Sequence, residues 1–262
     1  MFAPDGTAYD VTGNGPAVVL VHGLGLNRQM WQWLAPELHD FRVVSYDLTG
    51  HGESPDPEGA PDLQMFGEQI LRLIDHCGIV RCAVAGFSLG GMIARRFAID
   101  HPDRLMALAI LASAHGRTED ERAAIMLRVE TARRSGPGAT VEAALERWFT
   151  EPYRAANPEV MEQVRRWVLA NWPDIYPAIY QVMAEADAEL TQPISGIRCP
   201  TLVMTGDADP GSPPAMARRM ADAIPGAEAV ILPGLRHMGL AENPNQFNAP
   251  LIDFLNRALL ST

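Results

Sequence analysis

Short, continuous apolar runs alternate along the chain with longer segments in which apolar residues recur every three or four positions. A continuous run is typical of a strand buried on both faces of a parallel sheet, and the wider spacing is typical of a helix with one buried face. The runs predict strands at residues 7–11, 17–21, 41–46, 83–85, 105–112, 201–205 and 228–232. The spacing predicts helices at residues 30–38, 62–77, 88–98, 213–224 and 243–260. This alternation predicts an α/β fold with a mostly parallel central sheet flanked by helices.

The alternation stops between residues 117 and 190, where no convincing strand pattern occurs. Four helices are expected there, at residues 119–134, 141–149, 157–171 and 174–189. We therefore expect a core of residues 1–116 and 191–262, with residues 117–190 inserted into it as a helical lid. A lid over strand ends shapes the substrate pocket and excludes water, although a purely structural insertion produces the same pattern.

Length, composition and net charge limit the classes of protein to which the chain can belong. A chain of 262 residues with 47% hydrophobic content suits one α/β domain with an inserted subdomain. The formal net charge of −11 argues against nucleic acid or an anionic membrane surface as a partner, which leaves a small molecule. The longest apolar run, residues 105–112, is far too short to span a membrane, and the N-terminus lacks the pattern of a signal peptide. The oligomeric state stays open.

Cysteine usage favours a cytoplasmic protein. Cys77, Cys82 and Cys199 are odd in number, scattered, and lack the spacing of metal ligands, which suits reduced thiols. The chain also lacks a dinucleotide-binding fingerprint. We therefore expect neither a metal nor an organic cofactor.

A G-x-S-x-G pattern lies between the predicted strand at 83–85 and the helix that follows it. Ser88 is at its centre, flanked by Gly86 and Gly90. A serine at the apex of a sharp strand-to-helix turn needs neighbours without side chains, and strand, turn and helix are the context of a nucleophile elbow. A glycine-rich turn with a solvent-facing serine is the alternative interpretation.

Two further polar sites follow later strands. Asp207 and Asp209 come after the strand at 201–205, and His237 comes after the strand at 228–232. The carboxyl ends of parallel strands share one sheet edge, so these residues are expected near Ser88. A histidine activates a serine by accepting its proton, and a carboxylate behind it fixes the tautomer. We favour Asp209, which lies deeper in its loop, and expect Asp207 to brace that loop.

Two backbone N–H groups are candidates for stabilising the oxyanion that such a reaction forms. Leu24 lies in a glycine-rich loop after the strand at 17–21, and Leu89 follows Ser88 at a helix N-terminus. An ordinary strand-end turn is the alternative for the Leu24 loop. His51, in another glycine-rich turn, is expected to order its loop rather than to do chemistry.

Five motifs carry a resemblance to a known family. They are HGLG at 22–25, DLTGHGES at 47–54, GFSLGG at 86–91, GDADP at 206–210 and LPGLRHMGLAENP at 232–244. Over nearly its whole length the chain resembles the α/β-hydrolases, whose triads follow the order Ser, Asp, His. The resemblance implies that Ser88, Asp209 and His237 are catalytic and that the backbone of Leu24 and Leu89 forms the oxyanion hole.

A narrower resemblance is to the 3-oxoadipate enol-lactonase group. It rests on HPDRLMALAIL at 101–111, on LERWFT at 145–150, and on the link from residues 184–187 into 197–202. It implies hydrolysis of an enol-lactone in aromatic catabolism, and such a lactone of a dicarboxylic acid keeps a free carboxylate. An arginine is the preferred partner for that carboxylate.

The lid offers several arginines for this role. Arg133 and Arg147 are the chosen substrate-binding candidates, with Trp148 beside Arg147, and Arg117 and Arg134 are also available. Solvated helix faces are the alternative for each of them.

The sequence thus predicts a serine hydrolase that cleaves a small carboxylic ester or lactone through an acyl-enzyme at Ser88. A general carboxylesterase, a cofactor-free haloperoxidase-like perhydrolase and a C–C bond hydrolase on the same triad are the alternatives. A non-catalytic ligand receptor on the same scaffold is a further one, against which the complete triad argues.

Overall fold

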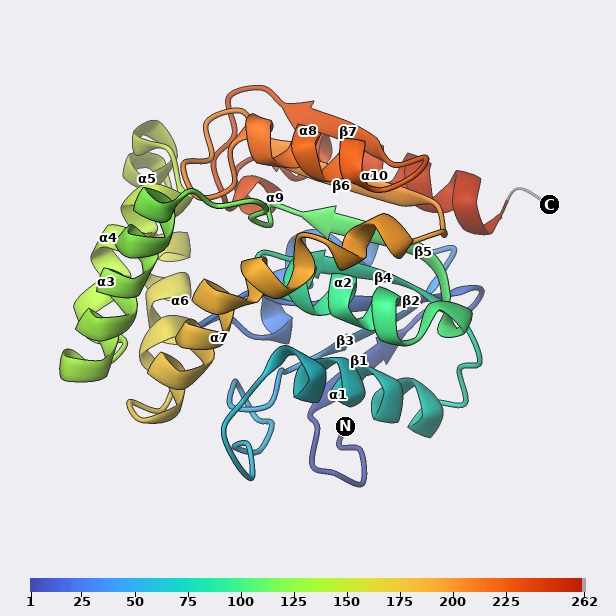
Figure 1. Ribbon diagram of the computed structural model, residues 1–262, viewed down its shortest axis with the longest axis horizontal. Helices are drawn as coiled ribbons and strands as arrows, with labels where there is room; N and C mark the ends of the chain where they lie inside the picture. The colour runs from blue at the N-terminus through green and yellow to red at the C-terminus, as the bar shows by residue number, and fades with distance from the viewer. Residues whose placement is uncertain (261–262) are drawn as a thin grey trace.

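The computed structural model describes residues 1–260, and a seven-stranded sheet lies at its centre (Figure 1). The strand order is β1-β3-β2-β4-β5-β6-β7. Only β1 runs antiparallel to its neighbour within the described sheet, so the predicted mostly parallel α/β fold is confirmed. The strands are β1 (Tyr9–Thr12), β2 (Ala17–Val21), β3 (Arg42–Tyr46), β4 (Cys82–Phe87), β5 (Leu105–Leu111), β6 (Thr201–Gly206) and β7 (Glu228–Leu232).

Side chains of each central strand alternate between two separate cores. In β2, Val19 and Val21 belong to the core that contains α1 (Leu63–His76), α2 (Leu89–Asp100) and α8 (Pro214–Ala223). Val18 and Leu20 belong to the core on the other face, which contains α10 (Pro244–Leu259). The continuous apolar run in β2 therefore reflects burial on both faces, as its pattern predicted.

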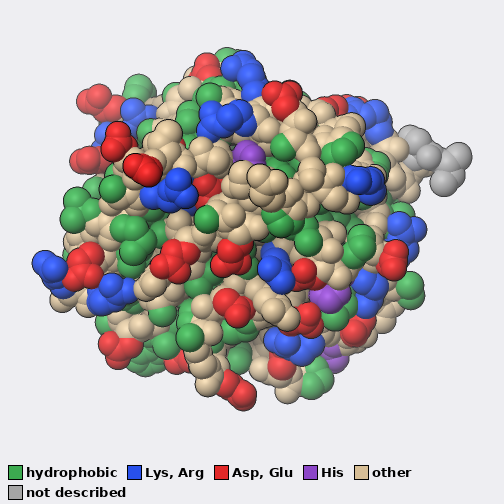
Figure 2. Space-filling model, viewed as in Figure 1, with side chains coloured by type: hydrophobic (Ala, Val, Ile, Leu, Met, Phe, Trp, Pro, Cys, Tyr) green, Lys and Arg blue, Asp and Glu red, His purple; other side chains and the backbone are tan. Residues whose placement is uncertain are grey.

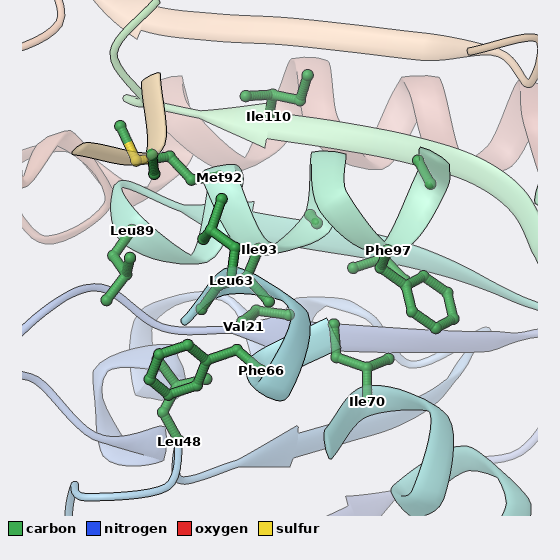
Figure 3. Close-up of a cluster of buried hydrophobic side chains, with 14 of the residues drawn as sticks. Val21, Leu48, Leu63, Phe66, Ile70, Leu89, Met92, Ile93, Phe97 and Ile110 are labelled. Atoms are coloured by element: carbon green, nitrogen blue, oxygen red, sulfur yellow. The ribbon is translucent and has the colours of Figure 1, made fainter. Parts of the chain in front are cut away.

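Figure 3 shows part of the first core, which lies between α1 and α2. Phe66 and Ile70 of α1 belong to it together with Ile93 and Phe97 of α2, and all four side chains are fully buried. Fully burying a side chain of this size stabilises the fold by about 1.5–3 kcal/mol. This packing fixes α2 against the sheet and holds its N-terminus at the carboxyl ends of β2 and β4.

Five helices lie between β5 and β6, where the alternation of the sequence stops. They gather at one end of the molecule in Figure 1, and the last of them runs back across α2. They are α3 (Glu119–Ser135), α4 (Gly138–Trp148), α5 (Glu151–Ala156), α6 (Pro158–Leu169) and α7 (Ile175–Leu190). The six-residue α5 was not expected, because so short a helix leaves little periodicity in the sequence.

The expected helix at residues 30–38 is wrong. The segment forms two 3-10 helices, η1 (Arg28–Trp33) and η2 (Ala35–Glu37). Pro36 lacks a backbone N–H and restricts the residue before it, so it disfavours a continuous α-helix through this segment. The structure also has a short helix, α9 (Gly239–Glu242), and two further 3-10 helices, η3 (Pro102–Arg104) and η4 (Pro193–Gly196).

The surface carries both signs of charge. On the face shown in Figure 2, basic and acidic side chains are interspersed. Across residues 1–260, no helix is long and apolar enough to cross a membrane. Cys77, Cys82 and Cys199 are free thiols.

Candidate active site

Ser88 lies at the turn between β4 and α2, with a backbone conformation that non-glycine residues rarely adopt. Its φ is 55° and its ψ is −113°. The Ser88 N–H donates to Leu111 O at 2.8 Å, and Ser88 O accepts from Gly91 N at 3.0 Å and from Ser113 Oγ at 2.8 Å. A strained residue persists only where its surroundings fix it, as these three hydrogen bonds do here. The predicted strand, turn and helix are confirmed.

The two glycines of the motif are required by close backbone contacts. A Cβ on Gly86 would lie 2.1 Å from Gly90 O, and a Cβ on Gly90 would lie 2.1 Å from Val21 O. Neither carbonyl belongs to a flexible side chain that can move away. Glycine at both positions therefore lets the elbow pack against β2.

His237 and Asp209 form a buried pair. His237 Nδ1 lies 2.7 Å from Asp209 Oδ2, and the two residues are 8% and 2% exposed. The other carboxylate oxygen of Asp209 accepts from Gly211 N at 2.8 Å and from Ser212 N at 3.1 Å. Asp209 is thereby fixed on both oxygens, and Nε2 is the imidazole nitrogen left for chemistry.

Asp207 takes the bracing role expected of it. It is exposed, and its Oδ1 accepts from Gly234 N at 2.7 Å. This bond ties the loop after β6 to the turn after β7, which leads to His237. Asp207 therefore supports the two loops without contacting the imidazole.

Two aromatic side chains contact the His237 ring. The Phe87 ring centroid lies 4.9 Å from it, and the Trp148 ring stacks on it at 6.1 Å with an interplanar angle of 27°. Met238 N also donates to Trp148 O at 2.9 Å. The end of α4 therefore helps to hold the histidine in place.

The loop after β2 lies against the elbow. A Cβ on Gly23 would lie 3.2 Å from Ser88 Cβ, so the backbone of this loop passes directly beside the serine. No hydrogen bond within residues 1–260 uses the N–H of Leu24 or of Leu89, and both residues are buried. Both groups are therefore available to an oxygen bound next to Ser88.

Two buried histidines order this loop. His51 Nε2 accepts from Gly25 N at 3.0 Å, and His22 Nε2 accepts from Leu48 N at 2.9 Å. Burial lowers the pKa of His22 to about 4 and that of His51 to about 3. Both imidazoles are therefore neutral at pH 7, as acceptors of N–H bonds must be. The structural role expected of His51 is confirmed.

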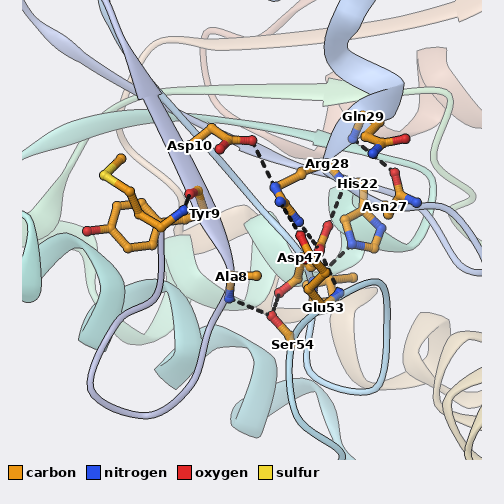
Figure 4. A network of polar contacts seen from close by, with 12 residues as sticks. Ala8, Tyr9, Asp10, His22, Asn27, Arg28, Gln29, Asp47, Glu53 and Ser54 are labelled. Atoms are coloured by element: carbon orange, nitrogen blue, oxygen red, sulfur yellow. Dashed lines mark hydrogen bonds and ion pairs between the residues drawn. The ribbon is translucent and has the colours of Figure 1, made fainter.

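A charged network supports the same loop from outside (Figure 4). Asp47 is fully buried, and its carboxylate accepts from Arg28 N at 2.7 Å and from Glu53 N at 2.9 Å. The Arg28 guanidinium forms ion pairs with Asp47, Asp10 and Glu53. The turn after β3 is thereby fixed to the segment that follows Leu24.

Ser88, Asp209 and His237 line one cavity, whose roof comes from the inserted helices. The cavity holds about 820 Å³ of space between atoms, counting its open mouth. Its lining also includes Leu24, Arg147 and Trp148, as the sequence predicted. Further lining residues are Arg117, Arg128, Tyr176, Tyr180 and Met183.

Arg133 does not line this cavity. It is exposed, with its guanidinium 2.9 Å from Glu130 and 2.7 Å from Gln181. Arg128, which sequence reasoning did not select, lies in the cavity instead, and its Nε donates to the Tyr180 hydroxyl at 3.1 Å. Helical spacing was the available signal, because Arg128 follows the buried Ile125 by three positions.

Comparisons with known proteins agree with this geometry. The family model described as "alpha/beta hydrolase fold" matches residues 16–244. The chain therefore belongs to the α/β-hydrolase family, and it is a hydrolase.

Three individual proteins are similar to this chain over most of their length. The chain is 29% identical to the (E)-2-((N-methylformamido)methylene)succinate hydrolase of Acinetobacter baylyi, over 92% of this chain and 90% of that protein. It is 28% identical to 3-oxoadipate enol-lactonase 2 of the same species, over 89% and 86%. The crystal structure of the enol-lactonase from Burkholderia xenovorans superposes with a TM-score of 0.89 at 31% identity, over 95% of this chain and 96% of that one.

Proposed function

We propose that the protein is a serine hydrolase that cleaves a small carboxylic ester or lactone through an acyl-enzyme. The hydrogen bond between His237 and Asp209, in one cavity with Ser88, carries this proposal. Ser88 is the nucleophile, His237 the general base and acid, and Asp209 the carboxylate that fixes the imidazole. The similarity of the chain to two enol-lactonases supports a lactone substrate.

The first half-reaction forms the acyl-enzyme. Ser88 Oγ attacks the carbonyl carbon, and its proton passes to His237 Nε2. The oxyanion accepts hydrogen bonds from the N–H groups of Leu24 and Leu89, and loss of one such donor costs about 3 kcal/mol in the barrier. The acyl C–O bond then breaks, and Nε2 returns the proton to the leaving oxygen. In a lactone that oxygen stays attached through the opened ring.

The second half-reaction releases the acid. Water attacks the acyl carbon and gives its proton to His237 Nε2. The bond between the acyl carbon and Ser88 Oγ breaks, and Oγ takes the proton back. The inserted helices act as the lid of this reaction, because they roof the cavity and separate it from bulk solvent, while single water molecules still reach the acyl-enzyme.

Arg147 and Trp148 serve as substrate-binding residues in this proposal. Both line the cavity, and Trp148 also stacks on the catalytic imidazole. Arg147 is half-buried and forms no hydrogen bond or ion pair within residues 1–260. A carboxylate next to the scissile ester group is the partner that its guanidinium fits.

Hydrolysis of 3-oxoadipate enol-lactone and p-nitrophenyl acetate by wild type and Ser88→Ala tests the proposal. We expect Ser88→Ala to abolish turnover while its unfolding curve matches that of wild type. A fluorophosphonate probe should phosphonylate wild type, with loss of fluoride, and leave Ser88→Ala unmodified. Turnover retained in Ser88→Ala would refute the mechanism. Ester cleavage without lactone cleavage would keep the mechanism and discard the lactone.

A further inference from the structure

Three arginines line the roof of the cavity, opposite Ser88. Arg117 precedes α3, Arg128 lies within α3, and Arg147 lies at the end of α4. All three are half-buried. The chain as a whole has a net charge of −11, so this concentration of positive charge runs against the overall balance.

The three guanidinium groups lack carboxylate partners. Surface arginines elsewhere form ion pairs, among them Arg72, Arg96, Arg104, Arg165 and Arg257. In the part of the chain that the structure describes, none of the cavity arginines has a carboxylate oxygen within 4.0 Å of its guanidinium nitrogens.

Their existing hydrogen bonds leave most donors unused. Arg117 donates one guanidinium bond, to Met183 O at 3.1 Å, and Arg128 donates one, to the Tyr180 hydroxyl at 3.1 Å. A guanidinium has five N–H donors. The remaining donors are available to an acceptor bound in the cavity that the three side chains line.

The arginines also repel one another. Burial lowers the pKa of Arg117 and of Arg147, and the charge of Arg128 lowers both further. Asp187 offsets part of this at Arg117, although its carboxylate accepts from the backbone N–H groups of Gly116 and Arg117. The charge of Arg128 thus acts on both of the other cavity arginines, so Arg128 is near enough to share a bound anionic group with either of them.

We propose that the substrate carries two carboxylates besides the acyl group that is cleaved. One lies between Arg117 and Arg128, and the other between Arg128 and Arg147. Asp187 offsets part of the charge of Arg117, so a single substrate carboxylate still leaves one cavity arginine without a counterion, whereas two carboxylates together with Asp187 match the three charges. This inference rests on the proposed function, and it implies that cleavage of an ester or lactone yields a tricarboxylic acid when the acyl part holds both groups.

A series of mono-p-nitrophenyl esters tests this charge count. The acids are acetic, succinic and propane-1,2,3-tricarboxylic acid, so the esters carry zero, one and two free carboxylates. We expect kcat/KM to rise about tenfold with each carboxylate, the factor that one charge-assisted hydrogen bond supplies. Arg128→Met should reduce the advantage of the dicarboxylate ester over the monocarboxylate ester to near unity. Arg122→Met, on the exposed face of the same helix, should retain it.

Equal kcat/KM for the last two esters, or an unchanged ratio in Arg128→Met, would overturn the inference. Titration of Ser88→Ala with propane-1,2,3-tricarboxylate and with succinate separates this outcome from failure of the proposed function. Tighter binding of the tricarboxylate, weakened by Arg128→Met, supports the inference even if no ester is turned over. Equal binding of the two acids counts against it even if Ser88 proves to be the nucleophile.

Discussion

The backbone carbonyl of Ser88, the proposed nucleophile, is held by a buried chain of hydrogen bonds that sequence motifs do not show. Arg95 NH2 donates to Ser113 Oγ at 3.1 Å, and Ser113 Oγ donates to Ser88 O at 2.8 Å. Arg95 is fully buried and also donates to Gly91 O at 3.1 Å and Ala114 O at 2.9 Å. We expect Ser113 to be a positioning residue for Ser88.

The hydrogen bonds of Ser113 determine how much Ser113→Ala should lower the free energy of unfolding. The change removes one neutral hydrogen bond, which contributes about 1 kcal/mol, and one bond to a charged donor, which contributes about 1.5–3 kcal/mol. Ser88 O keeps its bond from Gly91 N, and one N–H of Arg95 NH2 keeps Ala114 O while the other loses its acceptor. The free energy of unfolding should therefore fall by about 3 kcal/mol, or roughly 8 °C in Tm for a chain of this size.

Urea unfolding measures the loss of stability, and steady-state kinetics with p-nitrophenyl acetate measure the loss of activity. With less restraint on the Ser88 carbonyl, kcat should fall about tenfold, which is about 1.4 kcal/mol in the barrier, while KM stays the same. Ser195→Ala removes an exposed hydroxyl that donates to Gln192 O, and it should change stability by less than about 0.5 kcal/mol. A Ser113→Ala protein as stable and as active as the Ser195→Ala protein would refute the positioning role.

Two further predictions concern the carboxylate and the buried histidines. Asp209→Asn should lower kcat by roughly 10⁴-fold with an unchanged fold, because the amide favours the wrong tautomer of His237, whereas Asp207→Asn should change kcat by less than about tenfold. His22 and His51 are neutral in the folded protein, so below about pH 6.5 the unfolded chain binds more protons than the folded one. The free energy of unfolding therefore decreases as the pH falls from about 6.5 toward about 4. For His22 the difference between 6.5 and about 4 corresponds to about 3 kcal/mol. His51→Gln keeps an acceptor for Gly25 N, and urea titrations at pH 7 and pH 5 should show a smaller loss of stability than in wild type; an equal loss would contradict the assignment.

The sheet and the polar residues at its edge were predictable because each depends on local sequence. Apolar runs determine the strands, and Ser88, Asp209 and His237 each follow a strand within a few residues. A parallel sheet brings such positions to one edge whatever the details of packing. The exception at residues 30–38 arose from Pro36, whose effect on backbone geometry outweighs the amphipathic pattern around it.

The cavity wall was less predictable, because it depends on how helices from distant segments pack. Successive residues of a helix differ by about 100° in direction, so neighbouring arginines of α3 face different surroundings. Arg128 and Arg133 are of one type on one helix, yet the first lines the cavity and the second is exposed. Charge and helix propensity are the same for both arginines and do not distinguish them. The buried stripe of α3 distinguishes them only once it is known that α3 packs against α7.

The inserted helices also contact the segment that carries His237, the proposed catalytic base. Trp148 O accepts from Met238 N, the Tyr153 hydroxyl donates to Ala241 O at 2.8 Å, and Thr150 N donates to the Glu242 carboxylate. The segment from Trp148 to Tyr153 therefore fixes the residues on the C-terminal side of His237, while Arg147 faces the cavity. Because α4 supplies both a roof arginine and the ring stacked on the imidazole, any movement of α4 would act on His237 as well as on the pocket. Substitutions in this helix should consequently alter kcat together with KM, whereas loss of Arg117, which lies outside it, should act mainly on KM.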